Sequence, residues 1–106
     1  MIIIKSRRDF VDIQNNYDKK YHSDILLILI KKNVFTRFGY IVSKKVDKRA
    51  VVRNKIKRIL REIFRMAIKD NIVLNNDYEI IAKKDIVNKS FWEIKDVIYN
   101  LLKGQK

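Results

Sequence analysis

Several residue types on which small functional sites depend are absent or rare in this chain of 106 residues. Because it has no cysteine, a disulfide framework, a thiolate metal site and a cysteine nucleophile are all excluded. The single histidine, His22, excludes a histidine-based metal cluster and gives little support to acid–base catalysis. Proline is missing, and the two glycines, Gly39 and Gly104, are too far apart to form a glycine-rich phosphate loop.

Long apolar runs are also missing. The longest, residues 25–30, has six residues, whereas a membrane-spanning helix needs about 20. Residues 1–4 are too few for the apolar part of a secretory signal, because Lys5 interrupts them at once. We therefore expect a cytoplasmic protein that has no membrane segment.

The acidic residues are scattered singly along the chain, apart from Asp9 and Asp12 within one predicted helix. A phosphodiesterase that uses two metal ions needs several convergent carboxylates, and Asp9 and Asp12 fit better as stabilisers of a helix N-terminus. We therefore predict neither catalytic residues nor a metal site in the protein itself.

Positive charge dominates the composition, with 25 Lys and Arg against 12 Asp and Glu and a formal net charge of +13. Eleven of these basic residues, and only two acids, lie within residues 43–69. Apolar residues recur there at helical spacing, which predicts a helix over residues 50–69, about 30 Å long at 1.5 Å per residue. The apolar side comprises Val52, Ile56, Ile59, Leu60, Ile63 and Ala67, and the opposite side comprises Arg53, Asn54, Lys57, Arg58, Arg61 and Arg65.

Two interpretations of this basic side are open. A face that is merely solvated normally mixes both signs, with acids placed to form ion pairs along the helix. Here Glu62 is the only acid within residues 50–69, so the like charges repel one another unless an anion neutralises them. This imbalance favours binding to the phosphates of a nucleic acid.

The same region carries a longer motif. Residues 43–45 (SKK), 50–58 (AVVRNKIKR) and 60–62 (LRE) together resemble the signature of the bacterial ribonuclease P protein subunit. That family has an Arg-Asn-Arg box in its central helix, and the corresponding residues 53–55 depart from it at Lys55. Lysine lacks the bidentate fork that arginine offers to a phosphate.

The rest of the pattern predicts a single small α+β domain. Helices are expected over residues 7–16 and after Ser90, with Ser6 and Ser90 as candidate N-caps and Gly104 as the stop signal. The apolar face expected for the last helix comprises Trp92, Ile94, Val97, Ile98, Leu101 and Leu102.

Three strands are expected from the β-rich apolar runs. Residues 24–32 and 34–43 predict an antiparallel hairpin with a tight turn at Lys32-Asn33, and residues 77–84 predict a further strand. Gly39 lies in the middle of the second run, where glycine costs stability. Close approach of a base or backbone would explain it, and so would a bulge or a helix packed over it.

The resemblance covers about residues 4–103 and implies an α-β-β-β-α-β-α sandwich, similar to the second domain of ribosomal protein S5, with the basic helix at its centre. It also implies a short first strand near residues 18–22. In such a fold the helices lie largely over one face of a small sheet.

The resemblance further implies two RNA-binding sites. The residues that match the region docking on the catalytic RNA are Arg53, Asn54, Lys55, Lys57, Arg58 and Arg61. The residues that match the cleft for the single-stranded 5′ leader of precursor tRNA are Phe10, Ile13, Arg37, Tyr40, Ser43, Lys44, Lys45 and Lys83. Two positions depart from the family: Gln14 replaces a second aromatic, and Lys83 replaces an arginine. A hydrogen bond from Gln14 to a base edge could take over part of the lost stacking.

The expected function is therefore that of the protein subunit of ribonuclease P, with the catalytic RNA and precursor tRNA as partners. The RNA subunit would hold most of the Mg²⁺ and perform the hydrolysis that releases the mature tRNA 5′ end. No obligate protein partner is evident. Three alternatives remain open at this point: a ribosomal-type structural RNA binder, a DNA-binding module and an autonomous metal nuclease.

Overall fold

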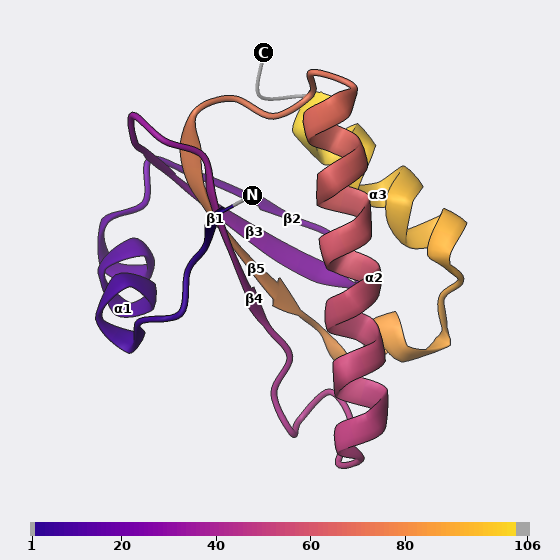
Figure 1. Cartoon of the computed structure of the whole chain (residues 1–106). Coiled ribbons are helices and arrows are strands. Elements are labelled where there is room, and N and C mark those ends of the chain that lie inside the picture. The colour runs from indigo at the N-terminus through magenta and orange to yellow at the C-terminus, as the bar shows by residue number, and fades with distance from the viewer. Residues whose placement is uncertain (1, 104–106) are drawn as a thin grey trace.

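The computed structural model describes residues 2–103 and arranges them in three layers (Figure 1). A sheet forms the middle layer, with α1 against one face and α2 and α3 against the other. The helices are α1 (Arg7–Asn16), α2 (Ala50–Lys69) and α3 (Phe91–Lys103), and the 3-10 helix η1 (Lys84–Asn88) precedes α3. The strands are β1 (Ile2–Ile3), β2 (Lys19–His22), β3 (Leu26–Lys32), β4 (Arg37–Ile41) and β5 (Asn76–Ala82). This arrangement confirms the predicted α+β class, but α1 lies on the opposite face of the sheet from α2 and α3, whereas the helices were expected largely over one face.

Strand β5 lies at the centre of the sheet, whose order is β1-β4-β5-β3-β2. It pairs antiparallel with β3 and parallel with β4, and α2 forms the crossover that the parallel pair requires. The predicted hairpin between residues 24–32 and 34–43 is therefore wrong, because β5 is inserted between these strands. Two successive apolar runs predict two strands, but they do not predict that the strands pair with each other.

The sheet edges differ from the sequence prediction in smaller ways. Strand β2 lies where the resemblance implied a first strand, whereas the two-residue β1, which pairs parallel with β4, was not predicted. Strand β5 ends at Ala82 rather than at Lys84, because the backbone turns there into η1.

The larger core lies between the sheet and the pair α2 and α3. Its centre is aromatic: the ring of Phe38 on β4 lies 5.1 Å from that of Phe64 on α2 and 5.3 Å from that of Tyr78 on β5. Helix α2 has the predicted bounds, and its buried residues are Ile56, Leu60, Ile63, Phe64 and Ala67. Sequence periodicity therefore predicted correctly which side of this helix is buried.

The ends of the helices show which capping predictions hold. Ser90 and Glu93 form the expected capping box at α3, with Ser90 Oγ accepting from the Glu93 amide at 3.2 Å and Glu93 Oε1 accepting from the Ser90 amide at 3.0 Å. Ser6 occupies the N-cap position of α1 as predicted, but its side chain makes no capping hydrogen bond there. Gly104, the predicted stop of α3, lies outside the described residues.

Trp92 is not part of the core, contrary to the prediction for α3. Its side chain is 65% exposed, and the Lys95 ammonium lies 5.3 Å from its ring centroid. Helix α3 buries Ile94, Ile98 and Leu102, which follow one another at four-residue spacing. A residue two positions before Ile94 points to the opposite side of such a helix.

Gly39 accommodates α1 on the other face of the sheet. A Cβ atom at this position would lie 2.3 Å from Cε1 and 2.7 Å from Cζ of Phe10, and 3.3 Å from Cβ of Ile4. The absence of a side chain therefore lets the Phe10 ring lie directly on the β4 backbone. Of the explanations open from the sequence, a helix packed over the glycine is the one that the structure supports.

We expect Gly39→Ala to lower the free energy of unfolding by about 1–3 kcal/mol, because the added methyl group displaces the Phe10 ring. In a Phe10→Ala background the same change should be neutral or slightly stabilising, because alanine is better than glycine in a strand. Urea denaturation of the wild type, the two single variants and the double variant gives the double-mutant cycle that measures this coupling. Equal losses in both backgrounds would show that the ring is not the obstacle.

Candidate RNA-binding surfaces

Strand register arranges the α1 face of the sheet in three rows across β4, β5 and β3. Residues directly opposite in paired strands point to the same face, so each row consists of three lateral neighbours. The rows are Arg37–Asp77–Lys31, Gly39–Glu79–Leu29 and Ile41–Ile81–Leu27. Helix α1 is packed here through Ile13, which forms a small buried cluster with Ile4 and Leu29.

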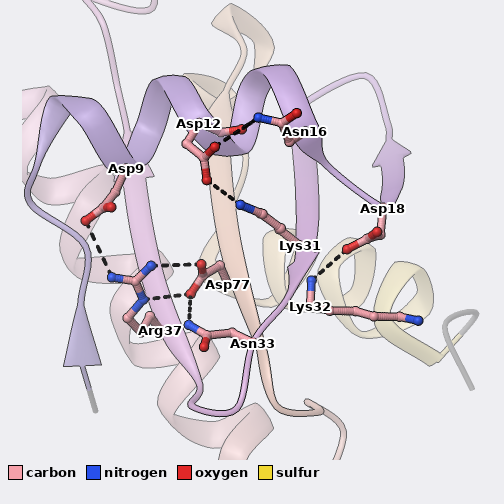
Figure 2. Close-up of polar contacts among 9 residues, drawn as sticks. All are labelled: Asp9, Asp12, Asn16, Asp18, Lys31, Lys32, Asn33, Arg37 and Asp77. Carbon is pink, nitrogen blue, oxygen red and sulfur yellow. Dashed lines mark hydrogen bonds and ion pairs between the residues drawn. The ribbon is translucent and has the colours of Figure 1, made fainter.

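The first row is a network of ion pairs that fixes α1 to the sheet (Figure 2). Arg37 donates to both carboxylate oxygens of Asp77, through Nε at 2.7 Å and Nη2 at 2.8 Å. Its Nη1 also donates to Asp9 on α1, at 3.4 Å. At the other end of the row, Lys31 is ion-paired with Asp12 on α1. Both cations of this row are therefore engaged by acids.

Two opposing effects set the pKa of Asp77. Burial raises the pKa of this carboxyl group, but the hydrogen bonds from Arg37 and Asn33 outweigh burial and hold it below its ordinary value. The pKa of Arg37 is raised, chiefly by its hydrogen bonds with Asp77. Arg37 thus positions α1 against the sheet and is not a freely available phosphate ligand.

The third row forms a partly exposed surface beside α1, which we call the apolar strip (Leu27, Ile41 and Ile81). Phe10, also partly exposed, packs on the same small core as Leu27 and Ile81. A partly exposed aromatic ring such as that of Phe10 can stack on an unpaired base, and the strip extends the apolar surface beside it. The sequence analysis did not select the strip, because its three residues come from separate strands and only the register brings them together.

Cations border the apolar strip where β4 and β5 end. Lys83 lies two residues beyond Ile81, and its Nζ donates to the Ser23 carbonyl at 2.6 Å. Ser43, which follows β4, is exposed and accepts from the Lys45 amide at 3.3 Å through its Oγ. Lys44 and Lys45 line a shallow depression together with Lys84. These are the positions from which phosphates of a strand lying on the strip could be reached.

Two of the predicted leader-binding residues do not lie at this surface. The side chain of Ile13, a residue of α1, is fully buried, so it can support Phe10 but cannot contact a ligand directly. Tyr40 is 9% exposed and points to the opposite face, where its ring centroid lies 6.0 Å from that of Phe64. Burial raises the pKa of Tyr40, while Arg61 and Arg65 partly oppose this rise.

The basic side of α2 forms the second candidate surface. Asn54, Lys57, Arg58 and Arg61 line one shallow depression together with Val51. These four predicted RNA-binding residues thus lie together on α2, and none of them is among the residues that the helix buries.

The other two residues predicted for this surface have different surroundings. Arg53 donates through Nη1 to the backbone carbonyls of Asp47 at 3.0 Å and Lys48 at 2.7 Å, and it thereby holds the segment that precedes α2. Lys55 lies in a groove between α2, η1 and α3. In the same segment, hydrogen bonds from Arg49 lower the pKa of Asp47 to about 2.

The geometry therefore offers two surfaces on opposite sides of one sheet (Figure 1). Within residues 2–103, no group of three or more histidine, aspartate or glutamate side chains is placed to hold a metal ion. In the same part of the chain, none of the helices has the length and apolar character needed to cross a membrane.

Comparison with known proteins decides between the interpretations left open by the sequence. The model of the family described as ribonuclease P matches residues 2–105. The chain belongs to the ribonuclease P protein family. Its members are the protein components of the endoribonuclease that processes tRNA 5′ ends, and this chain has that role as a subunit. Nothing in the comparisons supports the ribosomal alternative.

Individual ribonuclease P proteins resemble the chain over almost its whole length. The protein component of Fusobacterium nucleatum is 39% identical over 102 residues, which cover 93% of this chain and 85% of the relative. The solved ribonuclease P protein of Staphylococcus aureus matches with a TM-score of 0.87 at 28% identity, covering 100% of this chain and 96% of its own. That of Thermotoga maritima matches with a TM-score of 0.84 at 30% identity, covering 98% and 97%.

The stability of this ribonuclease P protein should depend on the charge of Asp77. The folded-state pKa of Asp77 lies below the ordinary value of 3.8. The stability that the ionised carboxylate contributes is therefore fully present above pH 3.8 and is lost as the pH falls through the folded-state pKa. Asp77→Asn should therefore cost about 3 kcal/mol at neutral pH, where it leaves Arg37 without its main partner, and progressively less as the pH falls through the folded-state pKa.

Urea denaturation at several pH values measures this difference, with the exposed Asp96→Asn on α3 as the matched control. A loss that is equally large at neutral and acidic pH would contradict an ionised Asp77 as the source of the stability.

Proposed function

We propose that the chain acts as a single RNA-binding domain that holds two RNAs, one on each side of its sheet. The basic side of α2 docks on the catalytic RNA of ribonuclease P, and the apolar strip beside α1 holds the single-stranded 5′ leader of precursor tRNA. The observation that carries this proposal is the placement of a cationic helix and a partly exposed apolar strip on opposite sides of one sheet.

Electrostatics governs the contact with the catalytic RNA. Asn54, Lys57, Arg58 and Arg61 form the centre of this contact because they share one depression. Each phosphate that a cation neutralises releases counterions, which makes the affinity strongly dependent on salt. Arg53 contributes by holding the segment before α2, and Lys55 extends the contact toward α3.

Stacking and apolar contact govern binding of the leader. Phe10 and the apolar strip offer surface to unpaired bases, and Ser43, Lys44, Lys45 and Lys83 border it with groups that bind phosphates. Ile13, Arg37 and Tyr40 act indirectly: Ile13 and Arg37 fix α1 in place, and Tyr40 supports β4 from the opposite core. Because every base has a π-face, stacking of this kind tolerates different leader sequences.

The hydrolytic step belongs to the RNA subunit in this proposal. Mg²⁺ would be held mainly by that RNA, where it would supply activation of the attacking water and stabilisation of charge on the phosphate. Five of the protein's own acids have other partners: Asp9, Asp12, Asp47 and Asp77 are in ion pairs, and Glu93 caps α3. The protein reduces repulsion between the two RNAs and adds affinity for the leader, within the cytoplasm.

Reconstitution tests the proposal directly. The purified protein is mixed with a bacterial ribonuclease P RNA at low Mg²⁺, and cleavage of precursor tRNA is followed with each component alone as control. We expect cleavage to require the RNA and the protein to accelerate it roughly tenfold or more, which corresponds to at least ~1.4 kcal/mol in the barrier. Tight binding without stimulation would contradict the subunit role, and cleavage by the protein alone would place the chemistry in the protein.

Removing single cations from α2 should lower the salt dependence of binding to the catalytic RNA. Arg58→Ala and Lys57→Ala should each reduce the slope of log K against log salt by roughly 0.7–0.9. Lys69→Ala is the matched control, because Lys69 lies on the same helix but outside the depression. Slopes that stay unchanged in both α2 variants would count against this helix as the docking surface.

A further inference from the structure

A buried carboxyl group lies beneath α1 in the second row of the sheet. Glu79 is 0% exposed and sits at the middle of β5, between Gly39 on β4 and Leu29 on β3. Its Oε1 accepts a hydrogen bond from Nε2 of Gln14 on α1 at 2.7 Å. Its Oε2 is buried and accepts no hydrogen bond from any residue within 2–103.

The surroundings make this an unfavourable position for a carboxyl group. Its lateral neighbours are a glycine and a leucine, and burial raises the pKa of Glu79 while the Gln14 hydrogen bond opposes the rise. The cations of the neighbouring row, Lys31 and Arg37, are already engaged by other acids. An apolar residue at this position would destabilise the fold less, because a buried polar group that lacks a full set of hydrogen-bond partners lowers the free energy of unfolding. Within residues 2–103, Gln14 is the one side chain that donates a hydrogen bond to this carboxyl group.

Gln14 connects this buried group to the surface. It is exposed and lies one helical turn after Phe10, on the side of α1 that meets the sheet. A glutamine amide has two N–H donors and one carbonyl acceptor, and Glu79 engages only one of the donors. The hydrogen bond to Glu79 fixes the orientation of the amide, so the remaining donor and the acceptor are held in a defined direction.

We propose that Gln14 binds the edge of an unpaired leader base by hydrogen bonds, and that Glu79 is the positioning residue that orients it. This inference rests on the proposed leader site beside α1. A base held through its edge is discriminated from other bases, whereas a base held only by stacking is not. The pair therefore adds sequence selectivity to a surface whose other contacts tolerate any base.

The test measures dissociation constants of the reconstituted protein–RNA complex for precursor tRNAs with leaders of only A, only C or only U, and for tRNA without a leader. For the wild type, the dissociation constants of the best-bound and worst-bound leaders should differ by about tenfold, which is in the lower part of the range for a base-edge contact. Gln14→Ala and Glu79→Leu should reduce this separation to less than about twofold. Glu79→Gln should retain most of it, because the amide oxygen of glutamine still accepts from Gln14.

Two further variants separate a role in recognition from a role in folding. The double variant Gln14→Leu, Glu79→Leu removes both polar partners together, so it should unfold at a temperature equal to or above that of the wild type while lacking base discrimination. Val11→Ala, an exposed change on the same helix, should alter neither property. If Glu79→Leu alone fails to fold, Gln14→Ala and the double variant still provide the result.

The outcomes also separate this inference from the proposed leader site. Phe10→Ala should weaken binding of all three leaders by a similar factor and leave leaderless tRNA unaffected. If leaders add no affinity in the wild type, the proposed leader site itself fails. If leaders add affinity but the wild type does not discriminate among them, or Gln14→Ala discriminates as the wild type does, Gln14 only caps a buried carboxyl group and the inference is overturned.

Discussion

Both proposed RNA-binding surfaces depend on the central position of β5. Its side chains alternate between the faces, so Tyr78 and Ile80 point into the core beneath α2 and α3, while Asp77 and Ile81 point toward α1. Pairing with β3 on one side and β4 on the other brings the two halves of the chain into one sheet. The helix that we propose contacts the catalytic RNA and the strip that we propose holds the leader are therefore fixed relative to each other by the same sheet.

The distribution of charge explains why the two surfaces suit different forms of RNA. On the α1 face, Lys31 and Arg37 are engaged by acids, and the exposed part of that face is apolar with cations at its edge. On α2, Glu62 is the only acid, and it pairs with Arg65 beyond the predicted docking residues. In the proposed arrangement, the excess positive charge is thus concentrated where the phosphates of a folded RNA would neutralise it, while unpaired nucleotides would meet apolar and aromatic side chains.

The helices could be predicted from the sequence because their signals are local, as the bounds of α2 and the capping box at Ser90 show. Strand partners could not, because an apolar run does not reveal which other run it will adjoin, and the predicted hairpin failed for that reason. The motif gave the residues of the α2 surface, but it could not show that Tyr40 faces the opposite core. The apolar strip and the contact between Gln14 and Glu79 both required the register of the sheet.

The absence of cysteine allows the division of the two RNAs between the two faces to be tested by site-specific cross-linking. A single cysteine would be placed either at Ser43, near the apolar strip, or at Asn54 on α2, and labelled with a photoreactive group. Each labelled protein would then be assembled with the catalytic RNA and precursor tRNA and irradiated. We expect Ser43→Cys to cross-link to the 5′ leader and Asn54→Cys to the catalytic RNA. Cross-links from both positions to the same RNA, or the reverse assignment, would contradict this division.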